Sequence, residues 1–185
     1  DIKKDESLTI DEMKAKLLSA AQYADVAATG ASTALVASIG EDDILRSICL
    51  GDCQLLVIRD GSIFSRTRET THYFECPYQL SEDSPDRPKD STILSTKLMS
   101  GDVLVAGSDG VFDNLDDASL LEIVSSSNKP NIVAQKLASE SRRVSLDPEA
   151  PTPFAKVAQK NRYANYSNGV GGKVDDISCV VANII

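Results

Sequence analysis

One stretch constrains the fold more than any other: the apolar run at residues 103–106 stops at the polar segment 108–113. A short apolar run bounded by a turn predicts a buried strand. Asp109 would then end the strand and Asp113 would follow one turn later, where both carboxylates could converge on one point. Grouped carboxylate oxygens suit a hard divalent cation, Mg²⁺ or Mn²⁺. The alternative, an Asp-Gly turn followed by a helix N-cap, is commoner for a lone Ser-Asp-Gly.

The net charge and the cysteine content restrict the classes of partner and of metal ion that the chain is expected to bind. Lys and Arg number 19 and Asp and Glu 28, and the net charge of −9 disfavours nucleic acid and anionic membranes as partners. An acidic chain needs a cation to bind phosphate. The four cysteines and single histidine match no common zinc spacing. Two of the cysteines lie in apolar runs, as free thiols often do, so we expect reduced thiols in an intracellular protein, with disulfides as the less favoured alternative. No apolar run approaches the roughly 18 residues of a membrane helix, and we expect no membrane segment in this chain.

The first half of the chain predicts one helix followed by short strands. Residues 9–24 predict an amphipathic helix, because Thr9 and Glu12 form a capping box and apolar residues share one face. Strands are predicted over residues 33–39, 44–50, 54–59 and 62–66. Acidic or Asp-Gly turns join these strands, so residues 30–71 are interpreted as an antiparallel meander.

The second half mixes a loop, strands and helices. Residues 72–90 contain three prolines and no steady period, which is typical of a long loop. Residues 91–115 contain two strands and the first acidic segment. Helices are predicted within residues 117–161, and residues 171–185 carry another acidic segment and the last strand. We expect a single α+β domain over residues 1–185.

Three acidic turns now stand out, each next to predicted β-structure. They are Leu50-Gly51-Asp52, the segment 108–113, and the segment 171–176 that ends in Asp175 and Asp176. Adjacent strands can bring such turns to one edge of a sheet, where clustered carboxylates repel each other unless cations lie between them. With one histidine and no cysteine ligand set, Mg²⁺ or Mn²⁺ is expected. Such a site allows a metal-activated water to attack phosphorus.

The ordered motifs resemble those of the metal-dependent protein phosphatases of type 2C, the PPM family. The segments that carry the resemblance are Gly30-Ala31-Ser32-Thr33-Ala34, Leu50-Gly51-Asp52, residues 107–115 and residues 171–178. Cys53 stands where the family usually has Ser. Residues 72–80 and Pro153-Phe154-Ala155 further resemble the subgroup of mitochondrial yeast Ptc-seven and its animal and plant relatives.

The resemblance implies a set of site residues. Asp109 and Asp175 would bind the first metal of a binuclear Mg²⁺ or Mn²⁺ centre, and Asp52 and Asp113 would join Asp109 around a third ion. Four further residues would support these ligands without binding metal: Gly51, Ser108, Gly110 and Asp176. His72 could protonate the leaving group, although a lone histidine that opens a long loop is more often structural.

The resemblance also implies a fold and an activity. The fold would be a sandwich of two antiparallel β-sheets with a helix pair on each outer face. The activity would be hydrolysis of phosphoserine and phosphothreonine in a phosphoprotein substrate, by in-line attack of a metal-activated water. We expect a monomer, and the subgroup resemblance implies the mitochondrial matrix.

One departure limits the activity of this chain. The family carries an acidic segment, an Asp-Gly-x-Gly-Gly motif and often an arginine upstream of these motifs, and none of them is found here. The chain therefore resembles the C-terminal portion of the catalytic domain, with half a metal site, and alone should turn over little or no substrate. A non-catalytic pseudophosphatase that binds partners is an alternative, although the four clustered acids argue against it. A third reading is an acidic β-rich binding domain whose aspartates merely form turns.

Overall fold

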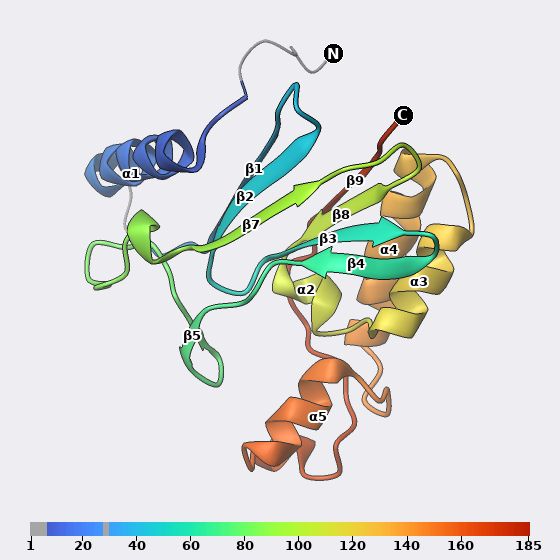
Figure 1. Ribbon diagram of the computed structural model, residues 1–185. Helices are drawn as coiled ribbons and strands as arrows, with labels where there is room; N and C mark the ends of the chain where they lie inside the picture. Colours follow the sequence, from blue (N-terminus) through green and yellow to red (C-terminus); the bar gives the residue numbers. More distant parts are fainter. Residues whose placement is uncertain (1–6, 28–29) are drawn as a thin grey trace. The chain divides into compact units, whose positions relative to one another are not determined.

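The computed structural model describes the backbone of residues 7–27 and 30–185 and the side chains of residues 7–22 and 30–185 (Figure 1). The chain divides into two compact units. Unit 1 consists of Asp1–Gln54 and Ser65–Ser100, and unit 2 consists of Leu55–Phe64 and Gly101–Ile185.

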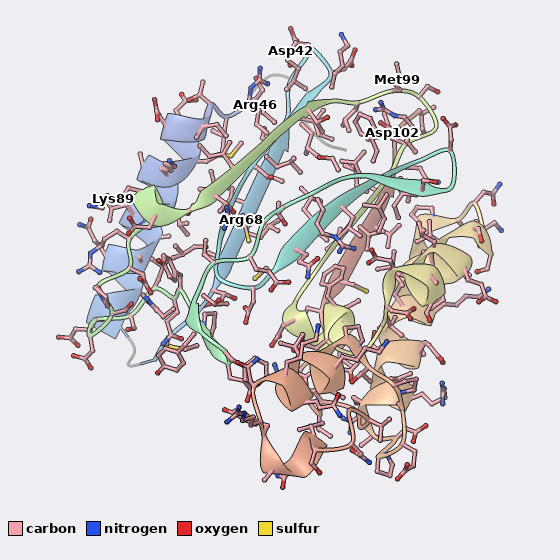
Figure 2. The ribbon with its side chains drawn as sticks, turned by 60° about the horizontal axis from the view of Figure 1, so that its bottom comes forward. Asp42, Arg46, Arg68, Lys89, Met99 and Asp102 are labelled. Carbon is pink, nitrogen blue, oxygen red and sulfur yellow. The ribbon has the colours of Figure 1, made fainter. Side chains whose placement is uncertain are left out.

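Unit 1 is built on a three-stranded antiparallel sheet. Its strands are β1 (Ala34–Ile39), β2 (Ile44–Leu50) and β7 (Thr92–Lys97), in the order β1-β2-β7. The register pairs Val36 with Ile48 and Ile48 with Ile93. At the β1–β2 turn, Arg46 donates to the Asp42 carboxylate (Figure 2). Because β2 is central and mostly buried, it anchors the segment that follows it, Gly51 and Asp52.

The predicted first helix is present as α1 (Ile10–Ala27), three residues longer at its end than expected. Its capping box is confirmed: the backbone N–H of Glu12 donates to Thr9 Oγ1 at 3.2 Å, and that of Thr9 donates to Glu12 Oε2 at 2.8 Å. Met13 is fully buried, and α1 contacts β2 and the short 3₁₀ helix η1 (Pro88–Asp90).

The structure differs from the long loop expected over residues 72–90. β5 (Thr71–Tyr73) and β6 (Cys76–Pro77) form a two-stranded ribbon, and η1 follows. Asp86, only 5% exposed, organises the segment: its Oδ2 accepts hydrogen bonds from the Gln79 backbone N–H at 3.0 Å and from Ser84 Oγ at 3.0 Å. Strands of two and three residues are too short to give a periodic sequence pattern. The three prolines therefore indicated a loop.

Unit 2 contains a four-stranded sheet. Its strands are β3 (Gln54–Arg59), β4 (Ser62–Arg66), β8 (Val103–Gly107) and β9 (Cys179–Asn183), in the order β4-β3-β8-β9. The first two bound a confirmed Asp-Gly hairpin, with φ values of 50° at Asp60 and 73° at Gly61. β9 is the last strand that was expected within residues 171–185.

The chain differs from the continuous meander expected over residues 30–71. β2 pairs with β1 and β7, whereas β3 lies between β4 and β8 in the other sheet. Both strands are almost continuous buried runs, which is typical of strands with a neighbour on each edge. The turn at Gly51–Cys53 therefore connects two sheets and does not close a hairpin. The α+β class with antiparallel sheets and helices is confirmed.

Unit 2 also contains four α-helices and a 3₁₀ turn. They are α2 (Asp109–Phe112), α3 (Asp117–Ser125), α4 (Pro130–Ser145) and α5 (Pro153–Lys160), followed by a 3₁₀ turn η2 (Ala164–Tyr166). Asp116 is the N-cap of α3, and its side chain accepts from the Ser119 backbone N–H at 2.9 Å. α4 contacts β9 and α3, and both helices lie on one side of the β8–β9 pair (Figure 1). The core between them includes Leu56, Val105, Val111, Leu120, Val133 and Leu137.

Candidate metal centre

The candidate site lies in unit 2, where β8 ends and the neighbouring strand β9 begins. β8 ends at Gly107, and Asp109 starts the single helical turn α2 directly after it. The antiparallel register pairs Gly107 with Cys179, so the acidic segment that precedes β9 lies beside α2. Strand pairing thus brings together two segments that are more than sixty residues apart in the sequence, as the acidic turns predicted.

Ser108 ties the two segments together. Its backbone N–H donates to the Ser178 carbonyl at 3.0 Å, and its Oγ accepts from the Ser178 N–H at 3.1 Å. The same Oγ donates to the Asp176 carbonyl at 3.1 Å. Gly110 lies so close to this carbonyl that an added Cβ would clash with the backbone of Asp176. Ser108 and Gly110 therefore fix the distance between the two acidic segments.

Three carboxylates converge on one ammonium group. Lys173 Nζ lies 2.8 Å from Asp109 Oδ2, 2.7 Å from Asp113 Oδ2 and 3.5 Å from Asp175 Oδ2. We call these four side chains the carboxylate cluster. Burial alone would lower the pKa of Lys173, but the charges and hydrogen bonds of Asp113 and Asp109 outweigh it, and the pKa lies above its ordinary value. Lys173 is therefore a full cation.

Asn114 holds the backbone of Lys173. The side chain of Asn114 is 3% exposed, its Oδ1 accepts from the Lys173 N–H at 2.9 Å, and its Nδ2 donates to the Lys173 carbonyl at 2.9 Å. The same amide donates to the Gly110 carbonyl at 3.0 Å. Thr152 Oγ1 donates to the Gly171 carbonyl at 2.6 Å and anchors the residues just before Lys173. The site thus rests on a fixed backbone.

Lys173 and Asn114 are the residues to which sequence reasoning gave no role. Both lie inside the motifs that carried the resemblance, but neither was expected to contact the acids. The available signal was the position of Lys173 two residues before Asp175, a cation within the acidic turn. Asn114 could have been singled out as an amide directly after Asp113.

The remaining predicted site residues lie in different surroundings. Asp176 is exposed, and its backbone N–H donates to Asp175 Oδ1 at 2.8 Å. Asp52 follows β2 in unit 1, so its place beside Asp109 stays a prediction. Gly51 has a φ of 100°, and an added Cβ would clash with the Thr33 side chain and the Tyr78 carbonyl. Glycine is therefore required at the turn that carries Asp52.

His72 lies in β5, also within unit 1. Its Nε2 is 3.1 Å from Asp86 Oδ2, and its ring stacks on Tyr78 with a centroid distance of 4.3 Å. These contacts hold the β5–β6 ribbon to the buried Asp86. The histidine therefore has a structural role in unit 1, and its part as a general acid stays a prediction.

The donor set of the carboxylate cluster suits a hard divalent cation. Three aspartates supply oxygens alone, and the ammonium of Lys173 stands in for a cation between them. No three Asp, Glu, His or Cys side chains among the described residues are positioned to hold a metal ion as they stand. The separations of 2.7 Å and 2.8 Å suit an ammonium group, whereas Mg²⁺ takes oxygens at about 2.0–2.1 Å.

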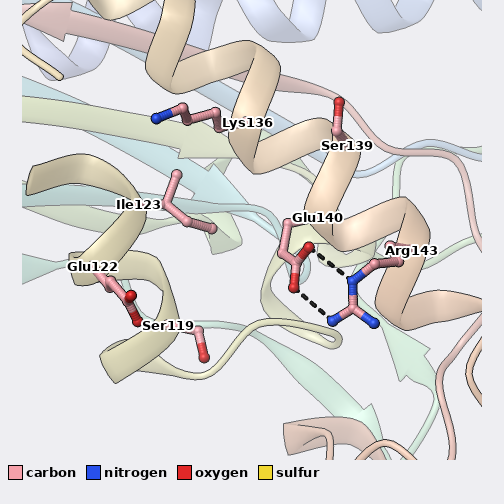
Figure 3. Close-up of a pocket in the computed structure, with 7 residues that line it drawn as sticks. All are labelled: Ser119, Glu122, Ile123, Lys136, Ser139, Glu140 and Arg143. Atoms are coloured by element: carbon pink, nitrogen blue, oxygen red, sulfur yellow. Dashed lines mark hydrogen bonds and ion pairs between the residues drawn. The ribbon is translucent and has the colours of Figure 1, made fainter. Parts of the chain in front are cut away.

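A pocket lies on unit 2 between α3 and α4, apart from the carboxylate cluster (Figure 3). In it Arg143 Nε and Nη2 donate to the two carboxylate oxygens of Glu140 at 2.9 Å and 2.7 Å. The other lining residues are Ser119, Glu122, Ile123, Lys136 and Ser139. The side chains of Glu140 and Arg143 in this pocket thus neutralise each other.

Comparison with known proteins identifies the family, although no family model matches the chain. The rice protein named "Probable protein phosphatase 2C 1" (Oryza sativa subsp. japonica) is 33% identical over 189 residues, covering 98% of this chain and 56% of the relative. The solved structure of the photosystem II phosphatase PBCP has a TM-score of 0.82 and 31% identity, covering 95% of this chain and 72% of PBCP. The chain belongs to the PPM phosphatase family.

Within the PPM family the chain resembles the PTC7 group, as its loop motifs predicted. The PTC7 homologue fig of Drosophila grimshawi is 32% identical over 170 residues, covering 84% of this chain and 54% of the relative. The chain spans about half the length of the curated relatives it matches. The PPM catalytic domain of PstP, solved with two manganese ions, matches with a TM-score of 0.66 and 16% identity, which shows the fold alone.

Proposed function

We propose that this chain forms part of the catalytic domain of a metal-dependent protein serine/threonine phosphatase. The observation that carries the proposal is the convergence of Asp109, Asp113 and Asp175 on one cation at the ends of β8 and β9. Membership of the PPM family supports the same activity, because the named relatives are protein phosphatases.

Asp109, Asp113 and Asp175 would hold Mg²⁺ or Mn²⁺, and Asp52 would join them from unit 1. When bound, such an ion supplies charge stabilisation at a phosphoryl group and acidifies a coordinated water. A second ion would complete the binuclear centre, and Asp52, Asp109 and Asp113 would be the ligands of a third. The manganese ions of PstP support a divalent metal in this fold.

The residues of this chain would hold the metal ligands in position, and the charge of the ligands would prevent phosphate from binding without metal. Ser108 joins the two acidic segments, and Asn114 holds the Lys173 backbone between them. Three carboxylates repel a phosphate dianion, so substrate would bind here only when cations compensate their charge. Binding of the substrate phosphate at this site would therefore depend on metal.

A phosphoprotein is the substrate class that this function implies. The similarity to PTC7 homologues supports a mitochondrial location, and we further propose that the protein acts as a monomer. Within the described residues, every helix is too short or too polar to cross a membrane.

A non-catalytic relative is the second candidate, and Lys173 favours it. An ammonium group that satisfies the three carboxylates removes part of the need for a metal, as in a scaffold that only binds partners. The two candidates differ in whether a divalent cation binds at all.

The test is Mn²⁺-dependent hydrolysis of a phosphoserine peptide by the full-length protein. We expect Asp109→Ala and Asp175→Ala each to lower kcat/KM by at least about 100-fold. Replacing a residue that only hydrogen-bonds to a metal ligand typically costs less activity. Asp83→Ala, which removes an exposed acid of unit 1, is the matched control and should retain activity. Undiminished turnover in both site variants would refute the ligand assignment. A wild-type protein that neither binds Mn²⁺ nor hydrolyses the peptide would favour the scaffold.

A further inference from the structure

Lys173 occupies the position toward which the ligands of the proposed metal point. Its ammonium donates hydrogen bonds to Asp109 and Asp113 and lies 3.5 Å from Asp175. One positive charge therefore faces three negative charges. The side chain of Lys173 is 20% exposed and those of the three acids are 24–35% exposed, so this charge is only partly screened by water.

The position of Lys173 is built into the fold. Both backbone polar groups of Lys173 bind the buried amide of Asn114. Gly172, just before it, packs so tightly that an added Cβ would clash with the backbone of Val144 and Ser145. The Lys173 ammonium also lies 5.1 Å from the centre of the Phe154 ring, a favourable cation–π distance. A fixed backbone thus delivers the ammonium to the three acids.

We propose that Lys173 is an internal counter-ion, which fills the carboxylate cluster without metal and must leave it before a divalent cation binds. The inference rests on the proposed metal site and adds a regulatory element to it. An ammonium group and a divalent cation cannot share the same carboxylate oxygens, because their charges repel and the metal requires oxygens about 0.7 Å closer than the ammonium does.

Two properties follow from this competition. First, Lys173 weakens metal binding, because each binding event must break its hydrogen bonds to Asp109 and Asp113. Second, Lys173 stabilises the metal-free chain, because removing one partner of a partly buried ion pair leaves uncompensated charge. Metal affinity and metal-free stability should therefore change in opposite directions when Lys173 is replaced.

The experiment compares wild type with Lys173→Met and Lys173→Arg in the full-length protein. Mn²⁺ affinity is measured by titration calorimetry, and the melting temperature is measured in EDTA and in Mn²⁺. We expect Lys173→Met to bind Mn²⁺ at least about tenfold tighter, equivalent to about 1.4 kcal/mol. In EDTA it should melt about 3 °C or more below wild type. Lys173→Arg should keep the weaker affinity and most of the metal-free stability, and Lys160→Met, an exposed lysine in α5, should behave as wild type.

The outcomes separate this inference from the proposed metal site. If Lys173→Met is too unstable in EDTA, Lys173→Gln serves in its place, and Mn²⁺ should still stabilise that variant more than wild type. Equal Mn²⁺ affinity and equal melting temperatures in wild type and Lys173→Met would overturn the counter-ion role but leave the metal site intact. Failure of wild type, Lys173→Met and Lys173→Gln to bind Mn²⁺ would overturn both.

Discussion

Replacing Asn114 should disturb the site without touching a proposed ligand. The side chain of Asn114 makes three hydrogen bonds, at 2.9, 2.9 and 3.0 Å, to the backbone of Lys173 and Gly110. A typical protein hydrogen bond contributes about 1 kcal/mol net, so Asn114→Ala should cost about 3 kcal/mol of unfolding free energy. Because domains are stable by only about 5–15 kcal/mol, this is a large loss.

The assay is urea unfolding of the full-length protein in EDTA. With a slope of about 2 kcal/mol per molar urea, the midpoint for Asn114→Ala should fall by about 1.5 M. Asn161→Ala is the matched control: it removes an exposed amide that donates to the Val157 carbonyl, and its cost should stay below about 0.5 kcal/mol.

The same variant should also weaken Mn²⁺ binding, because without Asn114 the backbone next to Asp175 is no longer held beside α2. A midpoint within about 0.3 M of wild type, together with unchanged Mn²⁺ affinity, would show that the amide does not organise the site. Lower stability with unchanged Mn²⁺ affinity would limit Asn114 to a role in packing.

Two further perturbations test unit 1 and the join between the acidic segments. Burial raises the pKa of Asp86, but hydrogen bonds from the Gln79 N–H and the His72 ring help bring it below its ordinary value, so its contribution to stability should be lost as pH falls below about 4. Melting curves at pH 5 and pH 3 should show this loss in wild type and a smaller one in Asp86→Asn. Gly110→Ala should push its Cβ into the Asp176 carbonyl, lower the melting temperature and weaken Mn²⁺ binding; wild-type values for both would contradict the close approach.

The elements with local signals were predicted well from the sequence. The capping box of Thr9 and Glu12 and the Asp60-Gly61 hairpin each depend on residues within a few positions of one another. Strand partners depend on distant residues. The pattern of β2 indicates that the strand is buried, but it does not indicate whether its neighbour is β3 or β7. The meander was expected for this reason, and the structure pairs β2 with β7, more than forty residues away.

The candidate site divides in the same way. The acids could be found because carboxylates beside strand ends are unusual, and the pairing of β8 with β9 brings Asp109, Asp113 and Asp175 together as expected. The contacts of Lys173 with Asp109 and Asp113 span 64 and 60 positions, and its contacts with Asn114 span 59. Neither lysine nor asparagine is unusual in an acidic turn or at a helix end. A cluster of acids requires a compensating cation, and that requirement alone does not distinguish a metal from a lysine. The tertiary structure makes this distinction, because Asn114 holds the backbone of Lys173 where its ammonium reaches Asp109 and Asp113.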